Sequence, residues 1–320
     1  MSIGQINYSI LVLWREKMSS KRYWTGPIID QHIHLDRGNR YLGAIEEFVI
    51  SGGSGIMLVH KPDFYSRLPL TTEEYKKEYE NTIQMGEEIR LKFKIDVGIV
   101  LGPHPVVWEK QSKIMGLEKS SELHLEAIKL ALDYIEDGHA HCLGEVGRPH
   151  YLVAKDIWSK ANEILLETFS LAKSADTSIQ LHVEENGDKT CAELSKLCSS
   201  AKFPKEMAIR HFSPPNISQK FNHGLSSTIN MGKNSVQGIC ETIQNSKSMW
   251  GMETDFLDDN MRPGAVLGPK TIAKRTQELY SELVSRDFDE DKITDILMNI
   301  HCNWPNQLYG LDFDSNPERK

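Results

Sequence analysis

The sequence predicts an α/β fold, a single (β/α)8 TIM barrel with a helical extension at the C-terminal end. Short apolar or β-branched runs alternate with segments of helical period, which favours βα units and a parallel sheet. Eight such runs fall within about 230 residues, the usual size of such a barrel. The chain contains no Gly/Ser-rich linker and no repeat of fixed period, so nothing in the pattern marks a second domain.

The expected strands are, in chain order, Ile28–Leu35, Gly55–His60, Lys94–Gly102, Cys142–Gly147, Ser178–Glu184, Met207–Phe212, Ser226–Gly232 and Met249–Phe256. Segments of helical period separate most of them, such as those that begin at Ser121 and Asp156. The sixth unit is short of helix, because a Phe-Ser-Pro-Pro-Asn loop leaves few residues before the seventh run. Two more helical stretches follow, Pro269–Val284 and Asp291–Ile300. We expect one to complete the barrel and the other to cap it.

Domain limits and cell compartment follow from the ends of the chain and its cysteines. Residues 1–26 are expected to be an N-terminal tail or extension, and residues 27–320 the barrel domain. The apolar run Ile10–Trp14 has only five residues, so no membrane span is expected. The five cysteines form no CxxC pair and are odd in number, which is typical of reduced thiols and favours a cytoplasmic location.

The overall charge limits the partners. The chain of 320 residues carries a net charge of −8 with a pI near 5.9, so no global positive field attracts a long polyanion. We therefore expect no binding of extended duplex nucleic acid. A small molecule or the short end of a nucleic acid in a local pocket remains compatible with this charge.

The first expected strand carries the motif Asp30-Gln31-His32-Ile33-His34. A period of two places Asp30, His32 and His34 on one face, with Ile29, Ile33 and Leu35 on the other. Two imidazoles on adjacent same-face positions can bind one metal ion. The alternative is that the histidines form the solvent-facing polar side of the strand.

Ligand-type residues also close four later runs. In a (β/α)8 barrel the C-terminal ends of the strands meet at one rim, and the residues found there are His32, His34, Glu145, His182, His211 and Asp255. Each of the last four has an ordinary alternative. Glu145 could serve the next turn, His182 could be a hydrogen-bonded core histidine, His211 could belong to a loop, and Asp255 could cap a turn. Their coincidence on one rim favours a common site.

Such a set of nitrogen and oxygen donors suits a divalent ion such as zinc, manganese, nickel or magnesium. Six donors exceed one tetrahedral site, and with a bridging carboxylate they suit two ions about 3.5–4 Å apart. A bound metal lowers the pKa of its water toward neutrality. Asp255 is the expected acceptor of the water's proton, because a ligating carboxylate lies next to that water.

The motifs together resemble the TatD-related branch of the amidohydrolase superfamily. The series Asp30-x-His32-x-His34, Gly102-Pro103-His104-Pro105, Gly144-Glu145-Val146-Gly147, His182, His211-Phe212-Ser213 and Thr254-Asp255 follows the order of that family over residues 28–256. The resemblance implies a TIM barrel, a centre of one or two metals, and hydrolysis. It also implies that His32, His34, Glu145, His182 and Asp255 are ligands, with Glu145 bridging. His211 matches a position beside the second metal or the substrate, and His104 one that contacts substrate.

This chain departs from the TatD-type deoxyribonucleases in two loops. After the Gly-Glu-x-Gly motif it has Gly147-Arg148-Pro149-His150 where they have Leu-Asp-Tyr, and after Thr254-Asp255 it has Phe256-Leu257-Asp258-Asp259 rather than a small residue and proline. It therefore resembles a divergent, archaeal-type TatD-like subgroup. The fourth strand has no lysine that could be carbamylated to bridge two metals, which separates the chain from the dihydroorotase-like branch.

Basic residues near the rim are candidates for binding an anionic group of the substrate. Arg148 follows Glu145 closely, and Arg262 and Lys270 follow Asp255. Pro269 suits the first turn of a helix, whose N-terminus favours an anion. The leading prediction is a metal-dependent hydrolase of a phosphodiester or phosphate ester. The alternatives are an amidohydrolase of a small amide or ester, and a barrel that binds metal without catalysis.

Overall fold

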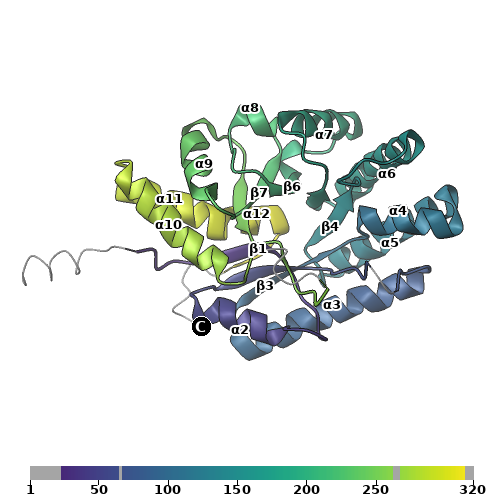
Figure 1. Cartoon of the computed structure of the whole chain (residues 1–320), viewed down its shortest axis with the longest axis horizontal. Coiled ribbons are helices and arrows are strands. Elements are labelled where there is room, and N and C mark those ends of the chain that lie inside the picture. Colours follow the sequence, from purple (N-terminus) through teal and green to yellow (C-terminus); the bar gives the residue numbers. More distant parts are fainter. Residues whose placement is uncertain (1–22, 65–66, 262–266, 314–320) are drawn as a thin grey trace, which may run out of the picture.

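The computed structural model describes residues 23–64, 67–261 and 267–313, and it places parallel strands inside a ring of helices (Figure 1). All eight expected strands are present. They are β1 (Ile29–His34), β2 (Gly55–Val59), β3 (Asp96–Leu101), β4 (Cys142–Gly147), β5 (Ile179–His182), β6 (Ala208–Ser213), β7 (Ser226–Asn230) and β8 (Trp250–Glu253), with a short β9 (Phe256–Leu257) directly after β8. The predicted TIM-barrel class is confirmed.

The segments between the strands form the helices α2 (Leu42–Ile50), α3 (Thr72–Phe93), α4 (Pro105–Met115), α5 (Leu117–Glu136), α6 (Lys155–Ser174), α7 (Asp188–Ala201), α8 (Gln219–Asn222) and α9 (Ser235–Thr242). Short 3-10 turns, η1 (Lys205–Met207) and η2 (Ile243–Asn245), precede β6 and follow α9. The sixth unit has only the four-residue α8, as the Pro-Pro loop predicted. After β9 come α10 (Thr271–Ser285), α11 (Glu290–Met298), a π-helical turn η3 (Asn299–Asn303) and α12 (Trp304–Tyr309).

The sheet closes on itself through the interrupted last strand. Hydrogen bonding follows the order β8-β7-β6-β5-β4-β3-β2-β1-β9, so the two ends of the order are β8 and β9. Only Thr254 and Asp255 separate these two strands in the chain. β9 pairs with β1, placing Ile33 opposite Phe256, and the Asp255 N–H donates to the His32 carbonyl at 3.1 Å. The ring of strands is therefore continuous.

Strand β1 does not alternate as the sequence predicted. Its register against β2 shifts between Asp30 and Ile33, as at a β-bulge, which changes the phase of the side chains. Ile29 packs in the cluster that contacts α12, whereas Ile33 packs in the cluster beneath α2 and α3. The prediction that Ile29 and Ile33 share one face was therefore wrong.

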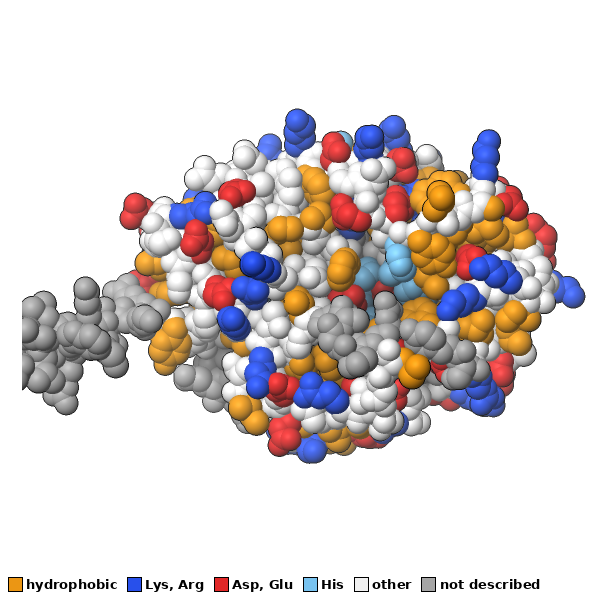
Figure 2. Space-filling model, in the orientation of Figure 1, with side chains coloured by type: hydrophobic (Ala, Val, Ile, Leu, Met, Phe, Trp, Pro, Cys, Tyr) orange, Lys and Arg blue, Asp and Glu red, His pale blue; other side chains and the backbone are white. Residues whose placement is uncertain are grey.

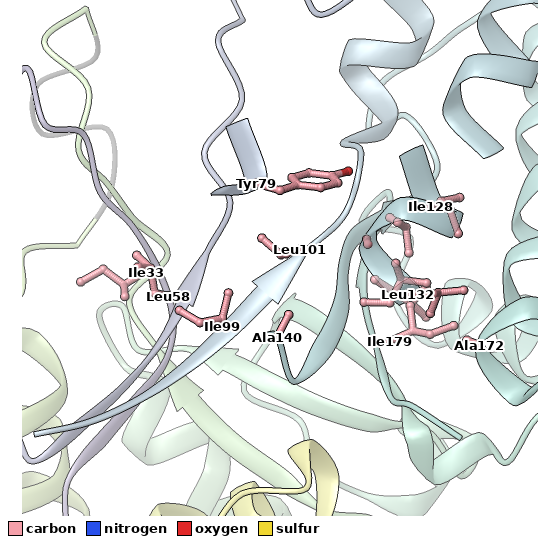
Figure 3. Packing of buried hydrophobic residues seen from close by; sticks show 14 of the residues in the cluster. Ile33, Leu58, Tyr79, Ile99, Leu101, Ile128, Leu132, Ala140, Ala172 and Ile179 are labelled. Carbon is pink, nitrogen blue, oxygen red and sulfur yellow. The ribbon is translucent and has the colours of Figure 1, made fainter. Parts of the chain in front are cut away.

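The largest apolar cluster lies between the strands and the surrounding helices. Figure 3 shows Ile33, Leu58 and Ile99 from neighbouring strands, with Ile128 and Leu132 of α5 in the same cluster. All are buried. Each strand therefore has one apolar face beneath the helices, which fixes the direction in which its other face points.

The C-terminal helices close the N-terminal end of the barrel. Leu308 and Tyr309 of α12 pack with Ile29 at the start of β1. The Tyr309 hydroxyl accepts from Gln180 Nε2 at 3.0 Å and donates to Gln31 Oε1 at 3.3 Å. The barrel is consequently filled at this end, and its opposite end is left for the polar rim.

The start of the described chain is held against α10. The Trp24 N–H donates to Gln277 Oε1 at 2.9 Å, and Gln277 Nε2 donates to the Trp24 carbonyl at 2.8 Å. All five cysteines are buried and free of disulfides. Among the helices that the structure describes, none combines the length and apolar character needed to cross a membrane.

Candidate metal centre

Histidine and carboxylate side chains converge at the C-terminal rim. They come from the ends of separate strands: His32 and His34 from β1, Glu145 from β4, His182 from β5, His211 from β6, and Asp255 from the break between β8 and β9. Figure 2 shows histidine side chains grouped near the centre of one face of the molecule. His32, His34, Glu145 and His211 are buried, while His182 and Asp255 are partly exposed and reach the mouth.

Glu145 lies between two sets of histidines. Its Oε2 is 3.2 Å from His34 Nε2 and 3.7 Å from His32 Nε2. Its Oε1 is 2.7 Å from His211 Nε2 and 2.9 Å from His182 Nδ1. The two oxygens of one carboxylate thus face different pairs of rings, which is the arrangement of a bridging ligand.

Asp255 lies on the β1 side of this cluster. Its Oδ1 is 3.6 Å from His34 Nε2 and 3.8 Å from His32 Nε2. The backbone at Asp255 has a φ of 50°, a left-handed conformation that is uncommon for residues other than glycine. Asp30 holds this break in place, because its carboxylate accepts from the Thr254 N–H at 3.0 Å and the Thr254 hydroxyl at 2.5 Å.

Polar contacts on the outer side of two rings leave their inner nitrogens free to bind an ion. His34 Nδ1 faces the carbonyl oxygens of Val59 and His60 at 3.2 and 3.1 Å, so it carries the proton and Nε2 has its lone pair toward the cluster. His211 Nδ1 lies 3.5 Å from the buried carboxylate of Glu253, with Nε2 again toward the cluster. Both rings are therefore oriented as metal ligands are.

His104 is oriented differently, although it also lies at the cluster. Its Nδ1 accepts a hydrogen bond from the Val106 N–H at 3.1 Å, as the N-cap of α4. A neutral ring that accepts at Nδ1 carries its proton on Nε2, and this Nε2 lies 3.9 Å from Glu145 Oε2. His104 therefore presents a hydrogen-bond donor to the site and not a lone pair.

The charges of the cluster shift its pKa values in opposite directions. Burial raises the pKa of Glu145, but the nearby rings of His211, His104 and His32 outweigh it and hold that pKa well below its usual range. Burial lowers the pKa of His211 and of His34, yet the Glu145 carboxylate leaves both raised. Burial keeps the pKa of Asp255 raised despite the same histidines. The pKa of Glu145 is therefore lowered and the pKa of Asp255 is raised, although both carboxylates belong to the same site.

Donor groups able to hold a divalent ion occur here in three combinations among the described residues, of which the first two share His32. These are His32, His34 and Asp255; His32, His211 and Glu253; and His104, Glu145 and His182. The orientation of His104 argues against its acting as a ligand. The remaining groups all lie on the one rim that the sequence predicted.

The basic residues predicted near the rim have other partners. Arg148 is buried, with its guanidinium 4.6 Å from the centre of the Trp158 ring and paired with Glu184 and Glu193. Lys270 directly precedes α10 and its Nζ lies 2.9 Å from Glu47 Oε1. Among the described residues, neither side chain contacts the histidine cluster, although the Arg148 N–H donates to the His182 carbonyl, and Arg262 lies outside the described residues. Their role in binding substrate therefore stays a prediction.

Two residues of the site were not among the candidates from the sequence. Glu253 on β8 also accepts from the Phe212 N–H at 2.7 Å, so it fixes both His211 and the chain that follows. His150 places Nδ1 at 2.7 Å from His182 Nε2. The sequence offered one indication of each: Glu253 is an acid two residues before Asp255, and His150 is a histidine just after the Gly-Glu-x-Gly motif.

The fold and the rim define the class of the protein. It is a TIM barrel of the metal-dependent hydrolase type, with clusters of histidine and carboxylate groups able to hold metal at the C-terminal ends of its strands.

Comparison with known proteins then gives the family. The family model described as TatD related DNase matches residues 29–303. The sequence is 28% identical over 292 residues to Uncharacterized protein MJ1127 of Methanocaldococcus jannaschii, covering 90% of this chain and 97% of that one. The chain belongs to the TatD-related DNase family.

Solved structures support the same fold. The TatD homologue YJJV of Escherichia coli superposes with a TM-score of 0.56 at 18% identity, covering 89% of this chain and 98% of that one. A TatD family hydrolase of Entamoeba histolytica gives 0.52 at 13% identity, covering 88% and 98%. A dihydroorotase of Saccharomyces cerevisiae gives 0.53 at 9% identity, covering 92% and 86%.

Proposed function

We propose that the protein hydrolyses a phosphodiester or phosphate ester with the help of one or two divalent ions held at the rim. The position of Glu145 carries this proposal, because its two carboxylate oxygens face separate pairs of histidines. His32, His34 and Asp255 would hold one ion, and His182 and His211 the other. Zinc, manganese, nickel and magnesium are the candidates for this donor set.

The residues present fit such ions on structural grounds. His32 Nε2 and His34 Nε2 are only 3.1 Å apart, and the outer hydrogen bonds of His34 leave its Nε2 without a proton. Neutral imidazole nitrogens and carboxylates that converge in this way are the usual ligands of borderline divalent ions. When bound, the ions would supply an activated water near neutral pH and stabilise negative charge on the phosphoryl group.

The carboxylates and His104 would have separate tasks. Asp255, whose pKa is raised by burial, is suited to take the proton of the attacking water, and Glu145, whose pKa is lowered, stays ionised as a ligand. His104 would donate from Nε2 to an oxygen of the substrate. Burial and the neighbouring His182 ring keep the pKa of His104 well below its usual range, so the ring is neutral when it donates.

Substrate size and location follow from the rest of the molecule. A net charge of −8 disfavours extended duplex, so we propose a small phosphate ester or the short end of a nucleic acid, in the cytoplasm. An amide or ester substrate is the alternative, although β4 contains no lysine to be carbamylated. Phosphate and amide substrates are therefore tested side by side.

A substrate panel tests the proposal. The full-length protein, loaded in turn with Mn²⁺, Zn²⁺, Ni²⁺ and Mg²⁺, is assayed on bis(p-nitrophenyl) phosphate, p-nitrophenyl phosphate, short single-stranded oligonucleotides and small amides. Turnover of a phosphate substrate that is lost in His32→Ala is expected. Turnover of amides alone would replace the phosphate assignment, and binding of metal without any turnover would favour a non-catalytic barrel.

A further inference from the structure

We infer that His150 is a positioning residue that sets the ring of His182 for binding an ion, and thereby controls the affinity of one half of the centre. This inference rests on the proposed metal site. His150 is not among the residues that carry the family resemblance, because it stands in the loop where this chain departs from the TatD-type pattern.

The first step concerns which nitrogen of His182 faces the centre. Its Nδ1 is 2.9 Å from Glu145 Oε1 and 3.1 Å from His211 Nε2. Its Nε2 lies on the other side, 2.7 Å from His150 Nδ1. His34 and His211 instead present Nε2 to the centre. His182 therefore presents Nδ1 to the centre where the other two rings present Nε2. When an ion binds through this Nδ1, the outer Nε2 is the nitrogen that holds the proton.

The second step concerns what receives that proton. A ring that binds an ion through Nδ1 carries hydrogen on Nε2, and at 2.7 Å only an acceptor is compatible with it. His150 Nδ1 is that acceptor. Partners of this kind fix the tautomer and orientation of a ligating histidine, and their loss typically weakens metal binding about 10–100-fold.

The third step is that His150 is held in place although its side chain is exposed. On one side, the Arg148 N–H donates to the His182 carbonyl at 2.9 Å, and the Arg148 guanidinium pairs with Glu184, two residues after His182. On the other side, the Tyr151 hydroxyl donates to Glu109 Oε2 of α4 at 3.1 Å. The loop is thus anchored before and after His150, so its ring is directed at His182.

The outer partners of the other ligating rings differ in kind. His34 is oriented by two backbone carbonyls, and His211 by the buried carboxylate of Glu253. Only His182, among the described rings of the centre, is oriented by an exposed imidazole. The half of the site that contains His182 should therefore depend on a single substitutable side chain, and the half that contains His32 and His34 should not.

Metal titration of the full-length protein tests this inference. Metal-free protein is titrated with Mn²⁺ by isothermal calorimetry, for the wild type, His150→Ala and His150→Asn. The asparagine Oδ1 occupies nearly the place of Nδ1 and can accept the same hydrogen bond. In His150→Ala one ion should bind as in the wild type and the other about 10–100-fold more weakly. His150→Asn should restore that second affinity to within a few-fold.

His139→Ala is the matched control. His139 is also an exposed histidine, but it lies in the loop before β4, at the opposite end of the barrel. Both ions should bind this variant as they bind the wild type. Equal Mn²⁺ binding by His150→Ala and the wild type would overturn the inference, as would His150→Asn that is as weak as His150→Ala.

The outcomes separate this inference from the proposed function. Two ions bound without hydrolysis, with one weakened in His150→Ala, would support the role of His150 and contradict the proposed catalysis. A wild type that binds no Mn²⁺ would overturn both.

Discussion

Two buried histidines at the rim, His34 and His211, differ from the buried histidine at the opposite end of the barrel. At the C-terminal rim, the carboxylate of Glu145 raises the pKa of His211 and His34 against the effect of burial. At the N-terminal end, His301 lies on η3 without a carboxylate, and burial lowers its pKa to about 3. A neighbouring carboxylate thus favours charge on His34 and His211, whereas burial keeps His301 neutral.

Hydrogen bonds explain why His301 stays neutral. Its Nδ1 accepts from the Ile29 N–H at 3.1 Å, and its Nε2 lies 3.0 Å from the Thr276 hydroxyl oxygen. That hydroxyl donates to the Ile272 carbonyl at 2.9 Å, so it accepts from Nε2. A second proton on Nδ1 would face the Ile29 N–H directly. Each nitrogen of this ring has one hydrogen-bond partner, as expected of a buried side chain with a purely structural role.

At the rim, by contrast, some buried polar atoms have no hydrogen-bond partner among the described residues. His32 Nδ1 and Glu253 Oε2 are buried without a hydrogen-bond partner in the described residues, and His32 Nε2 faces His34 Nε2. Buried polar atoms left in this state cost stability unless something else satisfies them. The unpartnered atoms at the rim lie where an ion is proposed to bind, whereas the His301 ring is satisfied by groups of the protein itself.

The largest effect that would sharpen this comparison is expected from Asp255→Asn. The amide keeps the size of the side chain but removes the proton acceptor, so kcat/KM should fall by about 10²–10⁴-fold with little change in Tm. Steady-state kinetics on the best phosphate substrate and thermal denaturation provide the measurements.

Asp259→Asn is the control for this substitution. Asp259 lies four residues after Asp255, and its carboxylate accepts from the nearby Met261 N–H at 2.8 Å. Its kcat/KM should remain at the wild-type value. Full activity in Asp255→Asn would exclude that residue as the proton acceptor.

Removal of metal is expected to have the next largest effect, and only at the rim. Chelation should abolish hydrolysis, and return of the ion at about 100 times its Kd should add about 2.7 kcal/mol to the free energy of unfolding. Hydrogen exchange by local opening should slow at the ends of β1 and β4, next to the ions, and stay unchanged in α12. A uniform change over both ends would contradict the division between them.

The convergence of the rim residues could be predicted from the sequence for a simple reason. Parallel strands of a barrel bring their C-terminal ends together, so His32, Glu145 and His211 had to approach one another once the strands were located. Seven of eight expected strands matched within a few residues, and the eighth continues as β8 and β9 around Asp255.

The rest depends on contacts that no periodicity records. The bulge in β1 adds a residue on one strand only, so alternation alone misplaced Ile29. The direction of Arg148 is decided by Glu184 and Glu193, which come from later parts of the chain. The role of Glu253 depends on how β8 lies relative to β6, with β7 between them, a relation set by register and not by local sequence.

A smaller and opposite effect is expected at the far end from Tyr309→Phe. The hydroxyl is buried and bonds both Gln180 and Gln31, so its loss leaves Gln31 Oε1 without a partner and removes one of the two hydrogen bonds of Gln180 Nε2. The free energy of unfolding should fall by about 1–3 kcal/mol, while kcat/KM at 25 °C stays unchanged. Urea denaturation and steady-state kinetics on the same preparation measure the two quantities. A loss of activity without a loss of stability would show that the two ends are coupled.

The smallest effect concerns acid, and it distinguishes the ends by sign. Because the folded pKa of His301 is about 3, below its ordinary value of 6.5, the unfolded chain binds the proton first and stability falls as pH decreases below about 6.5. Between pH 7 and pH 5.5 this group should account for about 1 kcal/mol of the loss. In His301→Gln that part should disappear, which urea denaturation at several pH values would show. His211 in the metal-free protein has a raised pKa, so its effect on the free energy of unfolding has the opposite sign. Its stabilising contribution is present below about pH 6.5 and is lost as pH rises through the folded pKa. Identical pH slopes for the wild type and His301→Gln would mean that His301 binds its proton equally well in the folded and unfolded chain, which would contradict the contrast between the two histidine environments.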